Sequence, residues 1–175
     1  GVISLGGVDT KKIPFHQLAE EISFVSQDNF LFDVSIRDNI RLGKPDASED
    51  EIIRAAKAAH CHEFIMALPG GYETKAGVAG GAMSGGERQR ITLARAILKP
   101  ASTIILDEAT AYADPENEAL IQEAISHLVK GKNLVVVAHR LNTIKQAHQI
   151  ILIDKGRIIA KGRHDELLQE PLYAS

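Results

Sequence analysis

Two adjacent carboxylates follow an apolar segment in the second half of the chain. Asp107 and Glu108 come directly after residues 103–106, which have the composition of a buried strand. At the carboxyl edge of a parallel sheet, where open α/β folds bind ligands, such acids need a cation or a proton to offset their burial. A magnesium nucleotide supplies the cation: Asp107 would hold the metal shell, and Glu108 would orient or deprotonate an attacking water. For the pair taken alone, a solvated loop or helix-capping acids is the simpler interpretation.

A serine and two glycines at the start of a long helical segment form a second candidate site. Ser84 and Glu87 have the spacing of a capping box, so a purely structural interpretation explains both residues. It does not explain Gly85 and Gly86, because glycine in the first turn costs helix stability. Glycines there let another backbone approach closely, and the exposed amides together with the helix dipole attract a phosphate. We therefore interpret residues 84–87 as a phosphate-binding segment.

Two further polar residues stand at the ends of apolar segments. Gln27 follows residues 22–26, and His139 follows residues 134–138. The imidazole of His139 is able to donate a hydrogen bond to a phosphate oxygen, although a lone histidine is more often structural. Gln27 is equally compatible with a polar loop, so each residue is weak evidence by itself.

Short apolar strands alternate with amphipathic helices along the chain. Continuous β-branched strands in such an alternation predict a parallel sheet covered by helices on both faces. The turn at residues 154–156 predicts an antiparallel hairpin near the end. The segment between Gln27 and the glycines is helical without strands, which indicates a separate lobe. The expected strands are 22–26, 103–106, 134–138 and 150–153, and the expected helices include 84–98 and 114–129.

Length and charge indicate one ordinary globular domain. The 175 residues are enough for a sizeable core, and 25% of them are charged. A net charge of −3 gives no basic face of the kind that nucleic-acid binding requires. No apolar run approaches the ~20 residues needed to cross a bilayer.

The single cysteine, Cys61, lies between His60 and His62. Two histidines and a thiol within three residues do not easily converge on one tetrahedral ion, so a helix-packing cysteine is the better interpretation. A lone cysteine also favours a reducing compartment.

Taken in chain order, these segments resemble the motifs of ABC ATPases. The resemblance covers essentially the whole chain, with the motifs in the family's order and at its usual spacings. Residues 24–32 and 137–141 are similar to exporter-fold members, and residues 111–118 are similar to members that handle iron–siderophore complexes. The corresponding segments are 26–27 (Q-loop), 84–87 (signature), 106–110 (Walker B), 114 (D-loop) and 138–140 (H-loop).

The resemblance implies that two such domains close head to tail around two ATP molecules with Mg²⁺. It implies that Asp107 holds the magnesium, that Gln27 touches the magnesium and the attacking water, and that Glu108 is the general base. His139 would clasp the γ-phosphate, and Asp114 would lie at the interface between the two domains. Positioning and charge stabilisation do nearly all the work in such phosphoryl transfer. The signature residues that would contact the ATP held by the partner domain are Ser84, Gly85 and Gly86, followed by Glu87 in the same motif.

The fold implied is an α/β, P-loop NTPase-like parallel sheet core with an inserted all-helical lobe and a C-terminal hairpin. The core is expected to be incomplete and to lack the Walker A strand. Residues 1–175 would form one partial ATPase domain. Within it, residues 33–98 would be the helical subdomain, and residues 1–32 and 99–175 the remainder of the RecA-like core.

This sequence departs from the family pattern in several places. It contains no Gly-x-x-x-x-Gly-Lys-Ser/Thr loop, which the family's order places before Gly1. Without that lysine and its amide cradle most of the phosphate grip is lost, so we expect the chain alone to hydrolyse ATP poorly or not at all. The signature has Met83 where leucine is usual and Glu87 where glutamine is usual. Val78 occupies the position of a glutamate that usually touches the membrane domain.

The leading hypothesis is therefore the ATP-hydrolysing motor of a membrane transporter at the cytoplasmic face of the cell membrane. Its implied partners are a second ABC ATPase domain, identical or not, and a transmembrane domain in the same polypeptide, with no nucleic acid. One alternative is a soluble ABC ATPase serving DNA repair or translation, which the exporter-like segments and the absence of a basic surface disfavour. Another is a non-catalytic binding module from a split gene.

Overall fold

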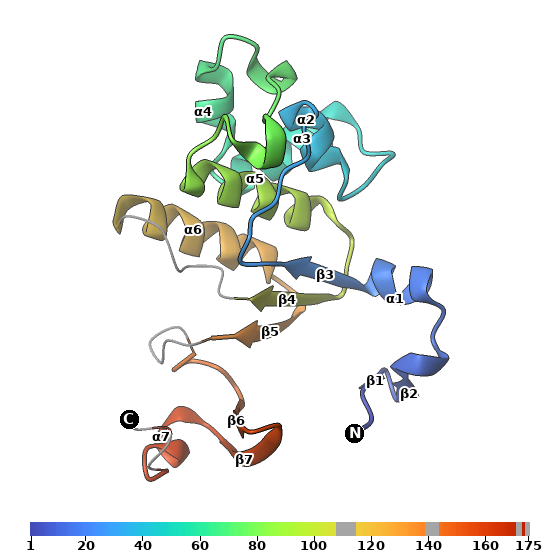
Figure 1. Ribbon diagram of the computed structural model, residues 1–175, viewed down its shortest axis with the longest axis vertical. Coiled ribbons are helices and arrows are strands. Elements are labelled where there is room, and N and C mark those ends of the chain that lie inside the picture. Colours follow the sequence, from blue (N-terminus) through green and yellow to red (C-terminus); the bar gives the residue numbers. More distant parts are fainter. Residues whose placement is uncertain (108–114, 139–143, 171–172, 174–175) are drawn as a thin grey trace. The chain divides into compact units, whose positions relative to one another are not determined.

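A three-stranded sheet organises the first part of the chain. In the order of the sheet its strands are β3 (Ile22–Val25), β4 (Thr103–Asp107) and β5 (Asn133–Val137), as Figure 1 shows. β3 and β4 are parallel, as the sequence predicts. The structure is a computed structural model that describes residues 1–107, 115–138, 144–170 and 173.

The two parallel strands end at the same edge of the sheet. Their register pairs Ile22 with Thr103 and Val25 with Leu106. Gln27 lies just beyond the last residue of β3, and Asp107 is the last residue of β4. Both residues are therefore at the carboxyl edge, where open α/β sheets bind their ligands.

Two long helices pack together beside this sheet. α5 (Gly85–Leu98) contacts both β3 and α6 (Pro115–Leu128), and the two helices lie side by side in Figure 1. α6 buries Ile121, Ala124 and Leu128, whose spacing of three and four residues places them on one helix face. These side chains share a buried cluster with the inward-facing residues of β4, Ile104 and Leu106.

Coverage of the sheet by helices is less complete than the sequence predicts. Phe24 of β3 remains 56% exposed, and Leu134 and Val135 of β5 remain 41% and 50% exposed. Among the described residues, helices therefore leave these three side chains partly uncovered, and the predicted coverage of both faces is not met at these positions.

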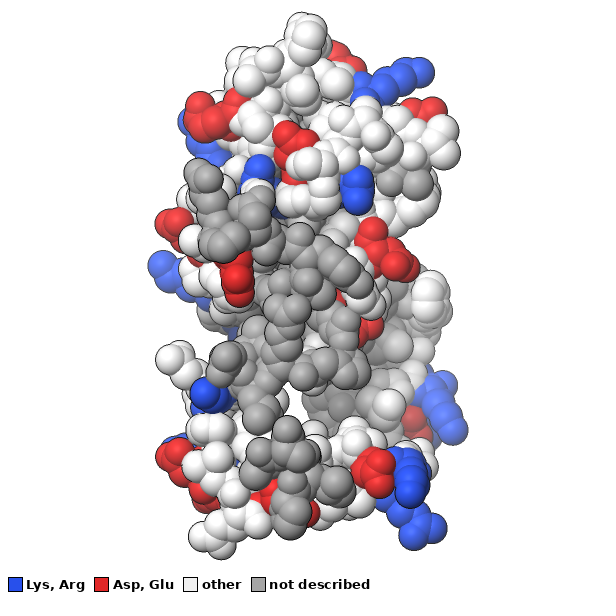
Figure 2. Space-filling view, turned by 60° about the vertical axis from the view of Figure 1, so that its left-hand side comes forward, with Lys and Arg blue, Asp and Glu red and all other residues white. Residues whose placement is uncertain are grey.

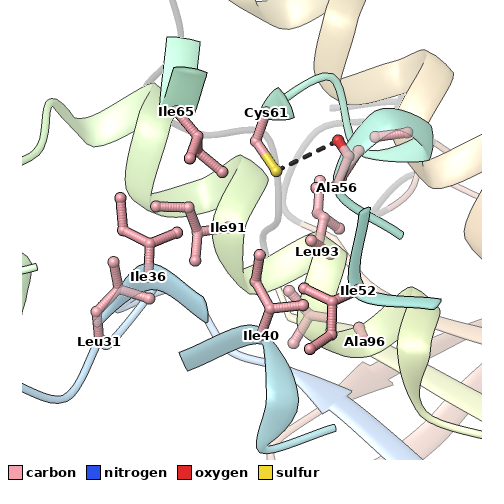
Figure 3. Close-up of a cluster of buried hydrophobic side chains, with 14 of the residues drawn as sticks. Leu31, Ile36, Ile40, Ile52, Ala56, Cys61, Ile65, Ile91, Leu93 and Ala96 are labelled. Carbon is pink, nitrogen blue, oxygen red and sulfur yellow. Dashed lines mark hydrogen bonds between the residues drawn. The ribbon is translucent and has the colours of Figure 1, made fainter. Parts of the chain in front are cut away.

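Three short helices pack against α5 to form a helical region. They are α2 (Ile36–Arg41), α3 (Glu49–Ala58) and α4 (His62–Ala67). Figure 3 shows their apolar side chains converging on α5, whose Ile91 and Leu93 are fully buried. Between Ile36 and Leu98 the structure contains helices and turns but no strand, as the sequence predicts.

A small hairpin and one helix precede the sheet. β1 (Ser4–Leu5) and β2 (Val8–Asp9) pair antiparallel around Gly6 and Gly7, whose φ angles of +57° and +82° favour glycine. α1 (Phe15–Glu21) then begins after Pro14 and leads directly into β3. This places β3 at the end of a continuous helix–strand connection.

The last part of the chain forms a separate unit. Contacts divide the chain into Gly1–Val135 and Val136–Ser175. In the second unit β6 (Ile150–Asp154) and β7 (Arg157–Gly162) form the predicted antiparallel hairpin, and α7 (His164–Leu167) follows. The turn residues Lys155 and Gly156 both have positive φ, as two-residue hairpin turns of type I′ require.

The observed architecture confirms the predicted fold class. It combines a parallel α/β sheet, a helical region and a C-terminal antiparallel hairpin. Across the described ranges, no helix has both the length and the hydropathy needed to span a bilayer.

Candidate functional site

The N-terminus of α5 is built by a capping box. The Ser84 hydroxyl accepts a hydrogen bond from the Glu87 amide at 3.3 Å, and the Glu87 carboxylate accepts one from the Ser84 amide at 2.8 Å. The predicted box is thus confirmed, and the carboxylate of Glu87 is engaged in it. A helix leaves its first amides without intrahelical acceptors, and the box uses that of Glu87. Gly85 and Gly86 occupy the first two helical positions, and their backbone amides point out of the N-terminal end of the helix.

This helix end is open on the side of Gly85. A β-carbon at Gly85 would meet only the end of the Arg88 side chain, 4.0 Å away. Ser84 and Gly85 are both exposed. Exposed amides at the positive end of a 14-residue helix suit an anionic ligand.

The turn before α5 is held in place by Arg88. Its guanidinium donates a hydrogen bond to the carbonyl oxygen of Met83 at 2.7 Å. Met83 is only 6% exposed, so its side chain packs in the core. The amide of Met83 donates to the carbonyl of Gly80, whose φ of +76° suits glycine. The approach to Ser84 is therefore a folded turn rather than a free linker.

The carboxyl edge of the sheet forms the second part of the candidate site. Asp107 is half-buried there, whereas Gln27 is exposed. The carbonyl oxygen of Gln27 accepts a hydrogen bond from the Asn29 side-chain amide at 3.1 Å, which shapes the loop after β3. Carboxylate and amide oxygens are the donors that Mg²⁺ prefers, so these two residue types fit a magnesium site.

The start of α5 and the carboxyl edge of the sheet lie at the same end of the strands. α5 runs into β4 through a short connection, so helix and strand are antiparallel and the start of α5 lies toward the strand tips (Figure 1). The structure thus places residues 84–87 and the pair Gln27 and Asp107 on one side. The remaining predicted site residues, Glu108, Asp114 and His139, lie outside the described residues.

Sequence reasoning missed a buried polar clamp between the loop after Gln27 and α5. Asn39 is completely buried, and its side-chain oxygen accepts from the Phe32 amide at 2.9 Å and from Arg95 at 3.0 Å. Arg95 also donates to the carbonyl oxygens of Asn39 at 2.8 Å and of Phe30 at 3.2 Å. Burial lowers the pKa of the Arg95 guanidinium. The sequence offered no clear signal, because both residues stand among other polar residues in amphipathic helices.

The loop held by this clamp presents two aromatic side chains outward. Phe30 is 48% exposed and Phe32 is 51% exposed, and their rings meet edge to face at 5.1 Å. Their backbone carbonyls are fixed from inside by Arg95 and Asn39. The result is a rigid backbone with an exposed apolar pair, directly after Gln27.

Cys61 is a packing residue of the helical region. Its side chain is fully buried, its thiol donates to the Ala56 carbonyl at 3.3 Å (Figure 3), and burial raises its pKa to about 12. The neighbouring histidines turn to other partners: His60 pairs with Glu123 at 3.1 Å, and His62 hydrogen-bonds Tyr72 at 2.9 Å.

Charge is distributed without a dominant sign. In the face drawn in Figure 2, lysine and arginine side chains are interspersed with aspartate and glutamate. This mixture agrees with the net charge of −3. Nothing among the residues coloured there forms a continuous basic surface.

Comparison with known proteins shows which protein family this chain is similar to. Residues 1–111 match the protein family described as ABC transporter. The chain is 48% identical over 168 residues to the ATP-dependent lipid A-core flippase of Legionella pneumophila (strain Paris), covering 96% of this chain and 29% of that protein. It is 48% identical over 176 residues to Heavy metal tolerance factor 1 of Caenorhabditis elegans, covering 100% of this chain and 22% of that protein.

A solved structure shows the same fold. The structure of a bacterial Atm1-family ABC exporter with ATP bound matches 99% of this chain and 31% of its own, with a TM-score of 0.92 and 36% sequence identity. The chain thus spans less than a third of the length of these relatives. The likeness of residues 111–118 to iron–siderophore members receives no support from them.

Proposed function

Because this chain belongs to the ABC transporter family, we propose that it forms most of the ATP-binding and ATP-hydrolysing domain of an exporter-fold transporter. One observation carries the proposal: the capped, glycine-containing start of α5 faces the same side as the carboxyl edge that bears Gln27 and Asp107. An anion-binding helix end and a cation-binding sheet edge are the two elements that a magnesium nucleotide needs.

The proposed roles follow the chemistry of each side chain. Asp107 and Gln27 supply oxygen ligands to magnesium, which when bound neutralises charge on the phosphate oxygens. A carboxylate oxygen of Glu108 takes the proton of the attacking water, and His139 donates a hydrogen bond to the γ-phosphate. Ser84, Gly85 and Gly86 bind the γ-phosphate of an ATP held by a partner domain. In the same arrangement Glu87 caps α5, and Asp114 lies at the interface of the pair.

The partners proposed are a second ABC ATPase domain and a transmembrane domain in the same polypeptide, at the cytoplasmic face of the membrane. The exposure of Ser84 and Gly85 supports the first, because a nucleotide from another domain is able to reach them. The exposed pair Phe30 and Phe32 supports the second, since it offers the membrane domain an apolar contact that is rigidly joined to Gln27.

We propose that residues 33–98 form the helical subdomain and that residues 1–32 and 99–175 belong to the RecA-like core. The succession of helices from α2 to α5, with no strand between them, supports the bounds 33–98 of the helical subdomain. The division by contacts, which separates Val136–Ser175, reflects the C-terminal hairpin rather than the helical region.

The test is ATP turnover by the complete gene product that carries these residues. We expect Glu108→Gln to lower magnesium-dependent ATP turnover by about 10²-fold or more, the range of a lost general base. Glu20→Gln, at an exposed position of α1, is the matched control and should leave turnover unchanged. Equal turnover in both variants would refute the assignment of Glu108.

A titration of the 175-residue chain separates the alternatives. With Glu108→Gln preventing turnover, we expect no saturable heat on adding ATP and magnesium up to millimolar concentrations. Saturable binding would favour a binding module that works without the Walker A loop. A soluble ABC ATPase would instead show turnover in a gene product without hydrophobic spans of ~20 residues.

A further inference from the structure

We propose that Asn117 is a positioning residue for the signature segment 84–87, and that Gly86 is glycine because Asn117 occupies the space beside it. The geometric part of this proposal stands by itself. Its consequence for ATP turnover rests on the proposed function of the signature segment.

The contact between Gly86 and Asn117 leaves no room for a side chain. A β-carbon at residue 86 would lie 2.9 Å from both Cγ and Oδ1 of Asn117, and 3.2 Å from its Nδ2. Carbon atoms in contact are normally 3.5–4.0 Å apart, so this approach is about half an ångström or more too close. Residue 86 and the first turns of α6 are therefore packed directly against each other.

Asn117 cannot simply turn away from this contact. Its Oδ1 accepts a hydrogen bond from Nη1 of Arg90, one turn further along α5. Arg90 is only 7% exposed, and its guanidinium lies over the ring of Phe64 at 5.2 Å. Rotating the Asn117 side chain would take an acceptor from a buried cation, which is costly. Gly86 and Arg90 thus hold Asn117 from two sides.

The two signature glycines are required for different reasons. Beside Gly85 there is open space up to the end of Arg88, at 4.0 Å, whereas Gly86 faces the side chain of Asn117. Gly85 is therefore the glycine that leaves room for a ligand, and Gly86 is the glycine that lets α6 approach. The sequence pattern gives no means of distinguishing them.

This contact joins the signature segment to the helix that starts directly after Asp114. α6 begins at Pro115, so Asn117 lies in its first turn. Any shift of this turn is transmitted to the amides of residues 85 and 86 through the Gly86–Asn117 contact and the Arg90 hydrogen bond. Asn117 touches neither nucleotide nor metal in this arrangement, and acts through the position of the backbone.

The experiment is a rescue in the complete gene product. We expect Gly86→Ala to lower ATP turnover by about 10²-fold, because displacements of about 1 Å have effects of that size. Adding Asn117→Ala removes Cγ and its two polar atoms, so the double variant should recover to the level of Asn117→Ala alone. Gly85→Ala is the matched control: it should lower turnover, and Asn117→Ala should not rescue it.

A second comparison isolates the Arg90 hydrogen bond. Asn117→Asp keeps an acceptor of the same shape and should retain turnover and the KM for ATP. Asn117→Leu has a similar size but no acceptor, and should lower kcat several-fold without changing KM. A smaller fraction of folded protein would also lower the apparent kcat at unchanged KM, so turnover is expressed per folded molecule, with the folded fraction of each preparation measured by size-exclusion chromatography. If kcat per folded molecule is the same in Asn117→Leu and Asn117→Asp, the role of the Arg90 hydrogen bond is refuted.

Stability of the 175-residue chain gives a readout that does not depend on ATP. Gly86→Ala should lower the urea midpoint, and Asn117→Ala should restore part of that loss. If the effects of Gly86→Ala and Asn117→Ala are additive in both turnover and midpoint, the proposal is wrong. If the midpoint is rescued but Gly85→Ala leaves turnover unchanged, the packing proposal stands and the phosphate-binding role of the segment fails.

Discussion

Replacing Asn39 with alanine should destabilise the chain more than almost any other single polar-to-alanine change. Asn39 is the fully buried centre of the clamp that joins the loop after Gln27 to α5. Alanine leaves the helix propensity of α2 intact or improved, so any loss must come from the clamp.

The size of the effect follows from the hydrogen bonds that are lost. The side-chain oxygen of Asn39 accepts hydrogen bonds from the Phe32 amide at 2.9 Å and from Arg95 at 3.0 Å. Its side-chain nitrogen donates to the carbonyl oxygens of Phe32 at 2.9 Å and of Ser35 at 3.1 Å. At about 1 kcal/mol each, and somewhat more for the bond from a charged guanidinium, the expected loss is about 4 kcal/mol. That is a large part of a typical unfolding free energy of about 5–15 kcal/mol.

Urea unfolding of the chain and of its Asn39→Ala variant measures this loss directly. Asn133→Ala, at an exposed position where β5 begins, is the control and should change the unfolding free energy by about 0.5 kcal/mol or less. In a double-mutant cycle with Arg95→Met, the two changes should be clearly non-additive, since they remove the same interaction. A loss below about 1 kcal/mol for Asn39→Ala would refute the account of the clamp.

Two further outcomes are expected from capping and from pH. Ser84→Ala and Ser48→Ala each remove the 3.3 Å bond to the serine hydroxyl of a capping box and keep the 2.8 Å bond from the backbone amide. Each should lower the unfolding free energy by about 1 kcal/mol, but only Ser84→Ala should reduce ATP turnover of the complete gene product. Equal turnover in these two variants would contradict the site. The hydrogen bond from Lys44, followed by that from the Ser48 amide, lowers the pKa of Glu51 to about 2. Because the pKa of Glu51 is lower in the folded state, its stabilising effect is present above the ordinary carboxyl range and is lost as the pH falls toward 2, so Glu51→Gln should flatten the acid side of the urea-midpoint profile. An unchanged profile would contradict the ion pair with Lys44.

The clamp and the Gly86–Asn117 contact together make α5 the organising element of the candidate site. Near its end, Arg95 fixes the loop that carries Phe30 and Phe32. At its start, Gly86 and Arg90 are joined to α6. Movements of the loop, of the signature segment and of the first turn of α6 are therefore mechanically linked through one helix.

Features whose partners are close in the chain were determined by the sequence itself. The capping box of Ser84 and Glu87 depends on atoms three residues apart, and the turn at Lys155 and Gly156 on two φ angles. Both were predicted correctly because the interaction and the residues that make it belong to one short segment. The parallel pairing of β3 and β4 followed from strand composition and the helices between them.

Only the tertiary structure decided which residues far apart in the chain support the site. Asn39 and Arg95 are 56 residues apart, and Arg90 and Asn117 are 27 apart. Composition and periodicity assign each of them to a helix but do not say what faces it across the core. Gly85 and Gly86 are adjacent residues of the same type, so the sequence does not distinguish them. The packing of α6 against α5 leaves open space beside Gly85 and places Asn117 beside Gly86. Such a close approach depends on two packed surfaces and not on one segment of the sequence.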